Sequence, residues 1–513
     1  MQDAPPRLLN TTTGRLCNRE AQINAFKTST EYKELLSLTV KHANLRMERI
    51  QDVVATFFHY VMLSHRWQRK EPLLHDIQDK NVYDLDPVDG FVKLQSFCNA
   101  ARDKGYRWAW SDTCCIDKNN NVEVQESVNS MFDWYRHSAL TIVHLSDVLP
   151  SSKPGALTNS VWNRRGWTFQ EFLAPKIVLF YQNNWTPYLN DLSPNHKESI
   201  AIMQELEYAT GIDPQALISF RPGMRGAREK LHWASMRITT LQEDVAYSLF
   251  GIFGVHLPVI YGEKKQNALG RLLQEIVARS GDISALDWVG KPSDFNSCLP
   301  AEISSYGAPP YTLPSPSDHE IQISVSSLRN SMAVDLASKL YAQLSNLRAP
   351  RFANCRLHIP CIIFPVTEIR RRAGHDQEIT YEVKTDGLNE LLITTEDRLI
   401  QFSRMRPIRQ QFLLVRPWDR SLLELPDFAS NIQSVEDWSP PRSPTEYGPV
   451  DSESHSRALR LIVRLGQHFS AFLLAQQWGG EYKRIASDNH IIAQVQDPAS
   501  IHNLIDVRTL EIL

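Results

Sequence analysis

Between residues 51 and 190 the hydrophobic positions follow two different periods in turn. Short aromatic and β-branched runs predict buried strands at VVATFFHYVMLSH (53–65), YRWAWSDTCCID (106–117), ALTIVHLSD (139–147) and KIVLFY (176–181). Between them apolar residues recur at helical spacing, as in the stripe of Val124, Val128, Met131, Phe132 and Tyr135. This alternation predicts an α/β fold with a doubly wound, mostly parallel sheet covered by helices on both faces.

The remaining sequence predicts four further parts. Residues 1–50 form a lead-in, residues 191–290 carry helical apolar stripes, and Pro, Ser and Gly in residues 291–318 predict a linker. Residues 319–513 predict a β-rich C-terminal domain from the period-two runs EIQISVS, RLHIPCIIFPV, EITYEV, LLITTE, RLIQFS, QFLLVRP, LRLIVRLG, AFLLAQQW and HIIAQV. Within it SVEDWSPPRSPTEYGPVDSESHS (434–456) predicts a long exposed loop.

Polar residues follow the predicted strands at one end. The segment Ser64–Trp67 ends the first strand, Asp112 follows the second, and Ser146 follows the third. Ligands of open parallel sheets bind outside the carboxyl ends of the strands. We therefore expect Ser64, Asp112 and Ser146 to lie near one edge of a single sheet with at least four parallel strands.

The stretch VWNRRGWTFQEFLAPKIVLFYQNNW (161–185) predicts a helix that Pro175 stops, followed by a strand. On that helix Arg164, Trp167 and Glu171 lie at i, i+3 and i+7 and share one face. A guanidinium, an indole and a carboxylate on one face suit a polar ligand. Taken alone, the stretch favours a structural interpretation, with a core tryptophan beside a solvated Arg164–Glu171 pair.

Other candidate motifs favour structural roles. Cys114 and Cys115 have no second ligand pair at zinc spacing, so we predict that both are reduced and bind no metal. His65 fits either a base or a residue that orients its loop, and Arg164 and Arg165 fit either solvated side chains or phosphate ligands. Neither GxGxxG nor GxxxxGK[ST] occurs, so neither a dinucleotide fingerprint nor a P-loop is indicated.

Composition narrows the class further. The 513 residues carry a net charge of −3, which gives no support to nucleic-acid binding. No run of 18 apolar residues predicts a membrane span, and the first residues lack the apolar core of a signal peptide. Seven scattered cysteines argue against a disulfide framework and indicate a reducing, cytoplasmic location.

Several motifs, taken in order, resemble the fungal heterokaryon-incompatibility (HET) domain. They are RLLNTTTGRL, YVMLSHRW, WSDTCCIDK, SVNSMFDWY, IVHLSD, RRGWTFQEFLAP and VLFYQNNW, and the block from WASMRITTLQED to GRLLQEI resembles the helical extension that usually follows. The resemblance covers about residues 7–290. Gln68 stands where the family commonly has Gly, Phe169 and Phe172 replace the usual Leu residues, and the lead before the first strand is long. These differences bear on loop shape more than on fold.

The resemblance implies a cell-death effector or signalling protein of fungal heterokaryon incompatibility or innate immunity. HET domains are similar to TIR domains, which have a flavodoxin-like parallel sheet, and some TIR domains cleave NAD at the nicotinamide–ribose bond with a glutamate. The matching motif GWTFQEF puts Glu171 at that catalytic position. NAD would then be a substrate, with no resident cofactor, bound by Ser64, His65, Arg66, Trp67, Asp112, Arg164, Arg165 and Trp167.

The same resemblance leaves a second function open. The domain then serves as a non-catalytic interaction or nucleotide-signal-binding module that acts by assembly. Expected partners are further copies of the chain or other proteins of an incompatibility pathway. A Glu171 that opens into a polar cleft beside Ser64–Trp67 favours the enzyme, and one sealed in a salt bridge favours the module.

Overall fold

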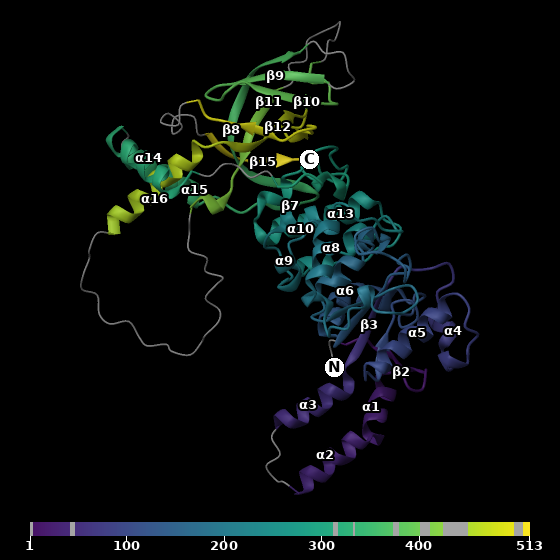
Figure 1. Ribbon diagram of the computed structural model, residues 1–513. Coiled ribbons are helices and arrows are strands. Elements are labelled where there is room, and N and C mark those ends of the chain that lie inside the picture. The colour runs from purple at the N-terminus through teal and green to yellow at the C-terminus, as the bar shows by residue number, and fades with distance from the viewer. Residues whose placement is uncertain are drawn as a thin grey trace. The chain divides into compact units, whose positions relative to one another are not determined.

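The computed structural model describes residues 4–41, 47–310, 316–331, 334–372, 379–400, 411–423, 450–496 and 506–513 (Figure 1). The chain forms two compact units. The first comprises Met1–Arg225 and Trp233–Leu272, and the second comprises Gly226–His232 and Leu273–Leu513. Within the described ranges, no helix combines the length and apolar character needed to cross a membrane. The boundaries predicted above for the parts of the chain remain predictions.

The first unit contains a six-stranded sheet in the order β2-β1-β4-β3-β5-β6. Its strands are β1 (Arg7–Asn10), β2 (Leu16–Asn18), β3 (Tyr60–His65), β4 (Trp108–Trp110), β5 (Leu140–His144) and β6 (Val178–Tyr181). β4, β3, β5 and β6 are parallel neighbours, which confirms the predicted parallel sheet of four strands. β1 pairs antiparallel with β2 and β4, so the whole sheet is mixed. Every residue of β3 and β5 is buried, as expected for central parallel strands.

The prediction of one long strand over residues 53–65 is wrong in its first half. Helix α3 (Met47–Phe58) ends there, and β3 begins only at Tyr60. Ile50, Val54 and Phe57 repeat at i, i+4 and i+7, so the run also fits an amphipathic helix. Tertiary packing favours the helix over the strand. Buried Phe57 contacts the Trp108 ring edge-on, with 6.2 Å between the ring centroids.

Helices and short 3₁₀ turns connect and cover these strands. They include α1 (Arg19–Thr28), α2 (Thr30–Lys41), α4 (Leu74–Ile77), α5 (Gly90–Asp103), α6 (Asn121–His137), α7 (Thr168–Leu173), η1 (Val82–Asp84), η2 (Val161–Arg164), η3 (Tyr188–Asn190) and η4 (His196–Glu198). The helical stripe predicted from Val124 to Tyr135 lies on α6, whose first turn is capped by the Asn120 side chain. Its stripe from Val128 to Tyr135 is buried as predicted.

Residues 191–290 are largely helical, as predicted. They contain α8 (Ile200–Thr210), α9 (Pro214–Ile218), α10 (Ala227–Ala234), α11 (Asp244–Tyr247), α12 (Phe250–Phe253), α13 (Lys265–Ser280) and η5 (Ile283–Leu286). The next stretch, predicted as a linker, instead holds η6 (Ile303–Tyr306) and the buried residues Cys298, Leu299 and Tyr306. Part of this stretch is therefore buried in the second unit, while other residues, such as Lys291 and Asp294, are exposed.

The second unit is built on a nine-stranded sheet, which confirms a β-rich C-terminal region. Its strands are β7 (Arg351–Ala353), β8 (Arg356–Arg371), β9 (Ile379–Thr385), β10 (Leu391–Thr395), β11 (Phe412–Pro417), β12 (Phe469–Gln476), β13 (Tyr482–Ile485), β14 (Ile491–Ala493) and β15 (Asp506–Ile512). β15 pairs with both β13 and β8, so part of the sheet closes on itself. A turn, η7 (Arg420–Leu423), follows β11.

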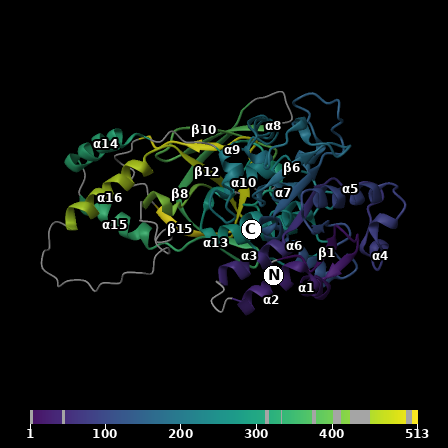
Figure 2. The ribbon, with the colours of Figure 1, turned by 60° about the horizontal axis from the view of Figure 1, so that its bottom comes forward.

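Two strand predictions in this unit are wrong. EIQISVS lies in helix α14 (Asp318–Ser331), and LRLIVRLG lies in α16 (Val450–Leu465). With α15 (Val334–Ser345) these helices pack on the sheet and share its hydrophobic core (Figure 2). Residues such as Ile321 and Val325 meet that core at helical spacing, which a short apolar run does not reveal. RLIQFS extends outside the described residues, and so does the predicted loop 434–456 up to the start of α16.

Candidate functional site

A cavity of about 410 Å³ opens in the first unit beside the carboxyl end of β3. Its walls come from the loops after β3 and β4, from α6, from the start of α7 and from the segment between 238 and 261. The lining residues are His65, Trp67, Asp112, Ile116, Lys118, Asn121, Val124, Ser127, Val128, Met131, Arg165, Gly166, Trp167, Glu171, Ile238, Thr239, Thr240, Leu241, Asp244 and Tyr261. The volume lies in the range of small-molecule sites.

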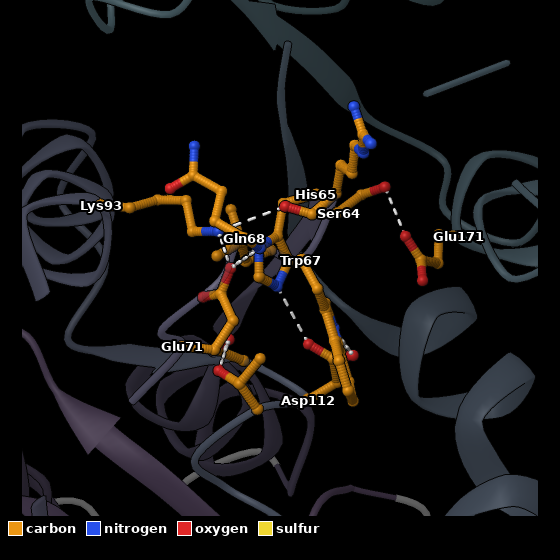
Figure 3. Close-up of polar contacts among 12 residues, drawn as sticks. Ser64, His65, Trp67, Gln68, Glu71, Lys93, Asp112 and Glu171 are labelled. Carbon is orange, nitrogen blue, oxygen red and sulfur yellow. Dashed lines mark hydrogen bonds and ion pairs between the residues drawn. The ribbon is translucent and has the colours of Figure 1, made fainter. Parts of the chain in front are cut away.

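Glu171 lines this cavity and is buried, with 6% of its surface exposed. Ser64 Oγ, at the end of β3, donates a hydrogen bond of 2.5 Å to Glu171 Oε2 (Figure 3). The same hydroxyl accepts a bond of 2.9 Å from Trp162 Nε1. Burial raises the pKa of Glu171 to about 8, and the charge of Asp112 adds to the effect. The side chain therefore holds a proton close to neutral pH.

The predicted continuous helix from Val161 to Pro175 is wrong. The 3₁₀ turn η2 ends at Arg164, and α7 begins only at Thr168. The backbone between them bonds to another segment, with Ile238 N donating to Arg164 O at 2.7 Å and Gly166 N donating to Ile238 O at 2.9 Å. A Cβ on Gly166 would meet the Thr239 side chain at 2.5 Å, so glycine permits this close approach.

This break separates side chains that the helical spacing placed together. Arg164 is exposed and lies outside the cavity, whereas Arg165 and Trp167 line it with Glu171. The predicted shared face of Arg164, Trp167 and Glu171 is therefore wrong. Glu171 forms no ion pair with any residue in the described part of the chain, since its polar contact is Ser64.

Asp112 joins two residues of the loop after β3. His65 Nε2 lies 3.0 Å from Asp112 Oδ1, and Trp67 Nε1 donates to Asp112 Oδ2 at 2.7 Å (Figure 3). Burial opposes ionisation of Asp112, but His65, Lys118 and Trp67 together lower its pKa to about 2. Lys118 Nζ lies 3.5 Å from the centre of the Trp67 ring, a cation–π contact. The cluster places an anion, a cation and an indole at one side of the cavity.

A buried ion pair holds the backbone of the loop after β3. Lys93, on α5, pairs with Glu71 and donates to Arg66 O at 3.3 Å. Gln68 N donates to Glu71 Oε1 at 2.5 Å, so the loop backbone is tied at two points. Burial lowers the pKa of His65, and the positive charge of Lys93 adds to that effect. Sequence reasoning missed both members of the pair, because nothing in the spacing links positions on a loop and a later helix.

The opposite wall contains a second acid that sequence reasoning missed. Asp244, the first residue of α11, accepts a hydrogen bond of 2.9 Å from Trp167 Nε1. Burial raises the pKa of Asp244 to about 6. In the sequence Asp244 follows a polar turn before an apolar run, and an acid there is typical of a helix start. No local signal distinguishes it from a capping residue.

Most of the predicted site residues come together. The structure places near one another Ser64, His65, Trp67, Asp112, Arg165, Trp167 and Glu171. The side chains of Arg66 and Arg164 are exposed and do not line the cavity. Ser64, Asp112 and Ser146 do follow the carboxyl ends of parallel neighbours, which confirms the predicted shared edge.

Cys114 and Cys115 are buried free thiols. The contact with Cys115 and burial both raise the pKa of Cys114, which keeps that thiol in its unreactive protonated form. Across the ranges given above, no group of three or more His, Cys, Asp or Glu side chains has a geometry for a metal ion.

The comparison with protein families gives the class of this domain. Residues 60–158 match the family described as heterokaryon incompatibility protein (HET). This region is thus similar to the HET domain, and the match includes β3, β4, β5 and α6.

One known relative is the vegetative incompatibility protein HET-E-1 of Podospora anserina, which is 36% identical over 241 residues. These residues make up 44% of this chain and only 17% of the relative. No solved structure matches the chain.

Proposed function

We propose that this chain is a cell-death effector of heterokaryon incompatibility, and that its pocket binds NAD and cleaves the nicotinamide–ribose bond. The HET domain and the similarity to an incompatibility protein support the biological process. One observation carries the chemistry: Glu171 is a buried carboxyl that lines a cavity of about 410 Å³ without an ion pair in the described part of the chain. A structural carboxylate is normally paired when it is buried.

The order of the parallel strands supports a flavodoxin/TIR-like fold for this domain. Among the four parallel strands, β3 comes first in the chain and lies between β4 and β5, with β6 beyond β5. Doubly wound sheets of the flavodoxin type have the same order and bind ligands where the first and third strands separate. Ser64 lies near that point, because it is the last residue but one of β3 and is paired in register with Val143 of β5.

The proposed chemistry uses the two protonation states of Glu171. The carboxyl is largely protonated in the empty pocket, because burial raises its pKa to about 8. The positive charge of the nicotinamide ring favours the carboxylate once NAD is bound. Nicotinamide then leaves with the bonding electrons, and the carboxylate stabilises the cationic ribose until water adds to it. The products are nicotinamide, ADP-ribose and one proton.

Other residues that line the cavity provide groups that can bind the remaining parts of NAD. Arg165 and Lys118 are cations that can neutralise the pyrophosphate. Trp67 and Trp167 offer indole faces for stacking, and Val128 and Met131 on α6 form an apolar wall. His65 and Asp112 fix the Trp67 indole by the hydrogen bonds described above.

Nicotinamide release from NAD tests this function. The full chain is purified at concentrations high enough for self-association, and release is compared between the wild type and Glu171→Gln by chromatography. We expect turnover by the wild type and its loss in the variant. Saturable NAD binding without release would support the alternative, a nucleotide-binding module that acts by assembly. Absence of both binding and release would contradict the proposal.

A further inference from the structure

Among the described residues, one of the two carboxylate oxygens of Asp244 accepts a hydrogen bond. The nearby Tyr261 hydroxyl also interacts with the carboxyl and favours its charged form. Oδ2 accepts the hydrogen bond from Trp167 Nε1 at 2.9 Å. Oδ1 is buried and has no hydrogen-bond partner among the residues that the structure describes. The residue is 7% exposed and lines the cavity of about 410 Å³. Buried polar atoms are almost always hydrogen-bonded, so this oxygen requires an explanation.

A role in orienting the Trp167 indole does not explain why Asp244 Oδ1 is left without a hydrogen-bond partner. One acceptor atom satisfies the indole N–H, and a neutral side chain such as asparagine provides that acceptor. A buried carboxylate with one unsatisfied oxygen destabilises the fold, because desolvation of that oxygen is uncompensated. The raised pKa of Asp244 reflects the same burial. A role toward a bound molecule accounts for the oxygen that has no hydrogen-bond partner in the described residues.

The surroundings indicate the kind of molecule. Lys118 and Arg165 line the same cavity, and the Arg165 Nε atom is buried without a hydrogen-bond partner in the described residues. A ligand that fits both features carries an anionic group for these cations and a neutral hydrogen-bond donor for Asp244. Nucleotides combine phosphate with ribose hydroxyls and amide or amine N–H groups.

We propose that Asp244 determines the ligand specificity of the pocket by accepting a hydrogen bond from a neutral donor on the ligand, a hydroxyl or an amide N–H. The identity of NAD as that ligand rests on the proposed function, whereas the requirement for a donor rests on Asp244 itself. Asp244 is a binding residue in this scheme, and Glu171 keeps the catalytic role. The helical segment that follows the HET match thereby supplies a recognition group.

Asp244→Asn tests the proposal with little change in shape. The amide oxygen of the variant still accepts from Trp167, and its NH₂ group replaces the acceptor that faces the ligand. We expect KM for NAD to rise about 10- to 100-fold, with a smaller change in kcat, because the ligand donor meets a donor. If Asp244 only positions Trp167, the variant keeps that bond and KM stays at the wild-type value, which overturns the proposal.

Glu243→Gln is the matched control. Glu243 is also buried and adjacent in sequence, but it bonds to Gly262 N at 2.8 Å and does not line the cavity. The control removes one negative charge at nearly the same place. We expect its KM to stay within about twofold of the wild type, as for a change outside the binding contacts. An equal rise in KM for both variants would assign the effect to charge alone and overturn the proposal.

Three analogues identify the donor. They are 2′-deoxy-NAD and 3′-deoxy-NAD, modified on the nicotinamide ribose, and nicotinic acid adenine dinucleotide, which lacks the carboxamide N–H. The wild type should lose affinity for the analogue without the donor, and Asp244→Asn should not discriminate against it. Equal discrimination by both proteins for all three analogues contradicts the proposal. If NAD binds without turnover, the same comparisons are made with Kd from calorimetry. In that case the proposal of NAD cleavage fails, and the proposal for Asp244 is still tested. Absence of NAD binding overturns both proposals.

Discussion

Ser64 Oγ donates a hydrogen bond of 2.5 Å to Glu171 Oε2, although 107 positions separate the two residues in the chain. Ser64 also accepts a bond from Trp162 Nε1, so its hydroxyl hydrogen is directed at Glu171. A strand end and a short helix are joined in this way at the cavity. The bond favours the ionised form of Glu171 and opposes the effect of burial on its pKa.

Glu171→Gln is expected to abolish activity and preserve the fold. The amide keeps the shape and still accepts from Ser64, but it carries no charge to stabilise a cationic ribose. Loss of one preorganised electrostatic contact commonly lowers the rate by about 10²–10³-fold. The measurements are nicotinamide release, cell killing and melting temperature on the same variant. Unchanged killing by a well-folded variant would exclude Glu171 as the catalytic residue.

Ser64→Ala should shift the pH dependence of the reaction upward. Removing the bond to Glu171 raises the pKa of the carboxyl further, so kcat/KM for NAD should reach half its maximum at higher pH than in the wild type. Trp162 Nε1 also loses its acceptor, which should lower the free energy of unfolding by about 1–3 kcal/mol. Ser111→Ala is the control, because buried Ser111 bonds to Thr113 instead. A pH profile shifted equally in both variants would contradict this role of Ser64.

The stability of the wild type relative to Glu171→Gln should fall as pH rises. The folded protein holds the Glu171 proton up to a pKa of about 8, whereas the unfolded chain releases it near 4.5. Between these values unfolding releases a proton, so higher pH favours the unfolded state, by up to about 1.4 kcal/mol per pH unit. Denaturant unfolding of both proteins at pH 5, 6, 7 and 8, pH values chosen to span this window, measures the difference. A difference that is independent of pH would show that Glu171 has an ordinary pKa in the folded protein.

Two adjacent arginines should behave differently. Arg165 lines the cavity, and Arg164 is exposed outside it. Arg165→Ala should weaken binding of NAD or ADP-ribose about 10-fold or more, because a charge-assisted contact to phosphate is lost. Arg164→Ala should leave the Kd unchanged. Calorimetric titration measures the Kd of both variants. Equal changes in Kd would place the phosphate outside this cavity.

The sequence pattern predicted the elements whose structure depends mainly on neighbouring residues in the chain. The stripe from Val124 to Tyr135 predicts α6 with its buried face, and the apolar runs around Val61, Ile142 and Phe180 predict parallel strands. Residues at the carboxyl ends of these strands had to share an edge, which located Ser64, His65 and Asp112 correctly. The predicted positions match the structure where the sheet sets them, and the binding and catalytic roles of these residues stay predictions.

Other features depend on contacts between distant segments, which periodicity does not contain. The helix that Val161 to Pro175 predicts is interrupted because its backbone bonds to Ile238. Asp244 reaches the cavity through its bond to Trp167, 77 positions earlier in the chain. The helices at 320–326 and 459–466 in the second unit were predicted as strands because short apolar runs fit both periods.

The pocket walls differ in their relation to the matched family region, which ends at residue 158. His65, Trp67, Asp112 and Lys118 lie within that region, whereas Arg165, Glu171 and Asp244 lie beyond it. The family match therefore includes β3, β4, β5 and one side of the cavity, whereas β6 and the side that carries Glu171 lie outside it. The family match by itself therefore does not define what the cavity binds, and a comparison of ligand specificity has to include residues 161–261.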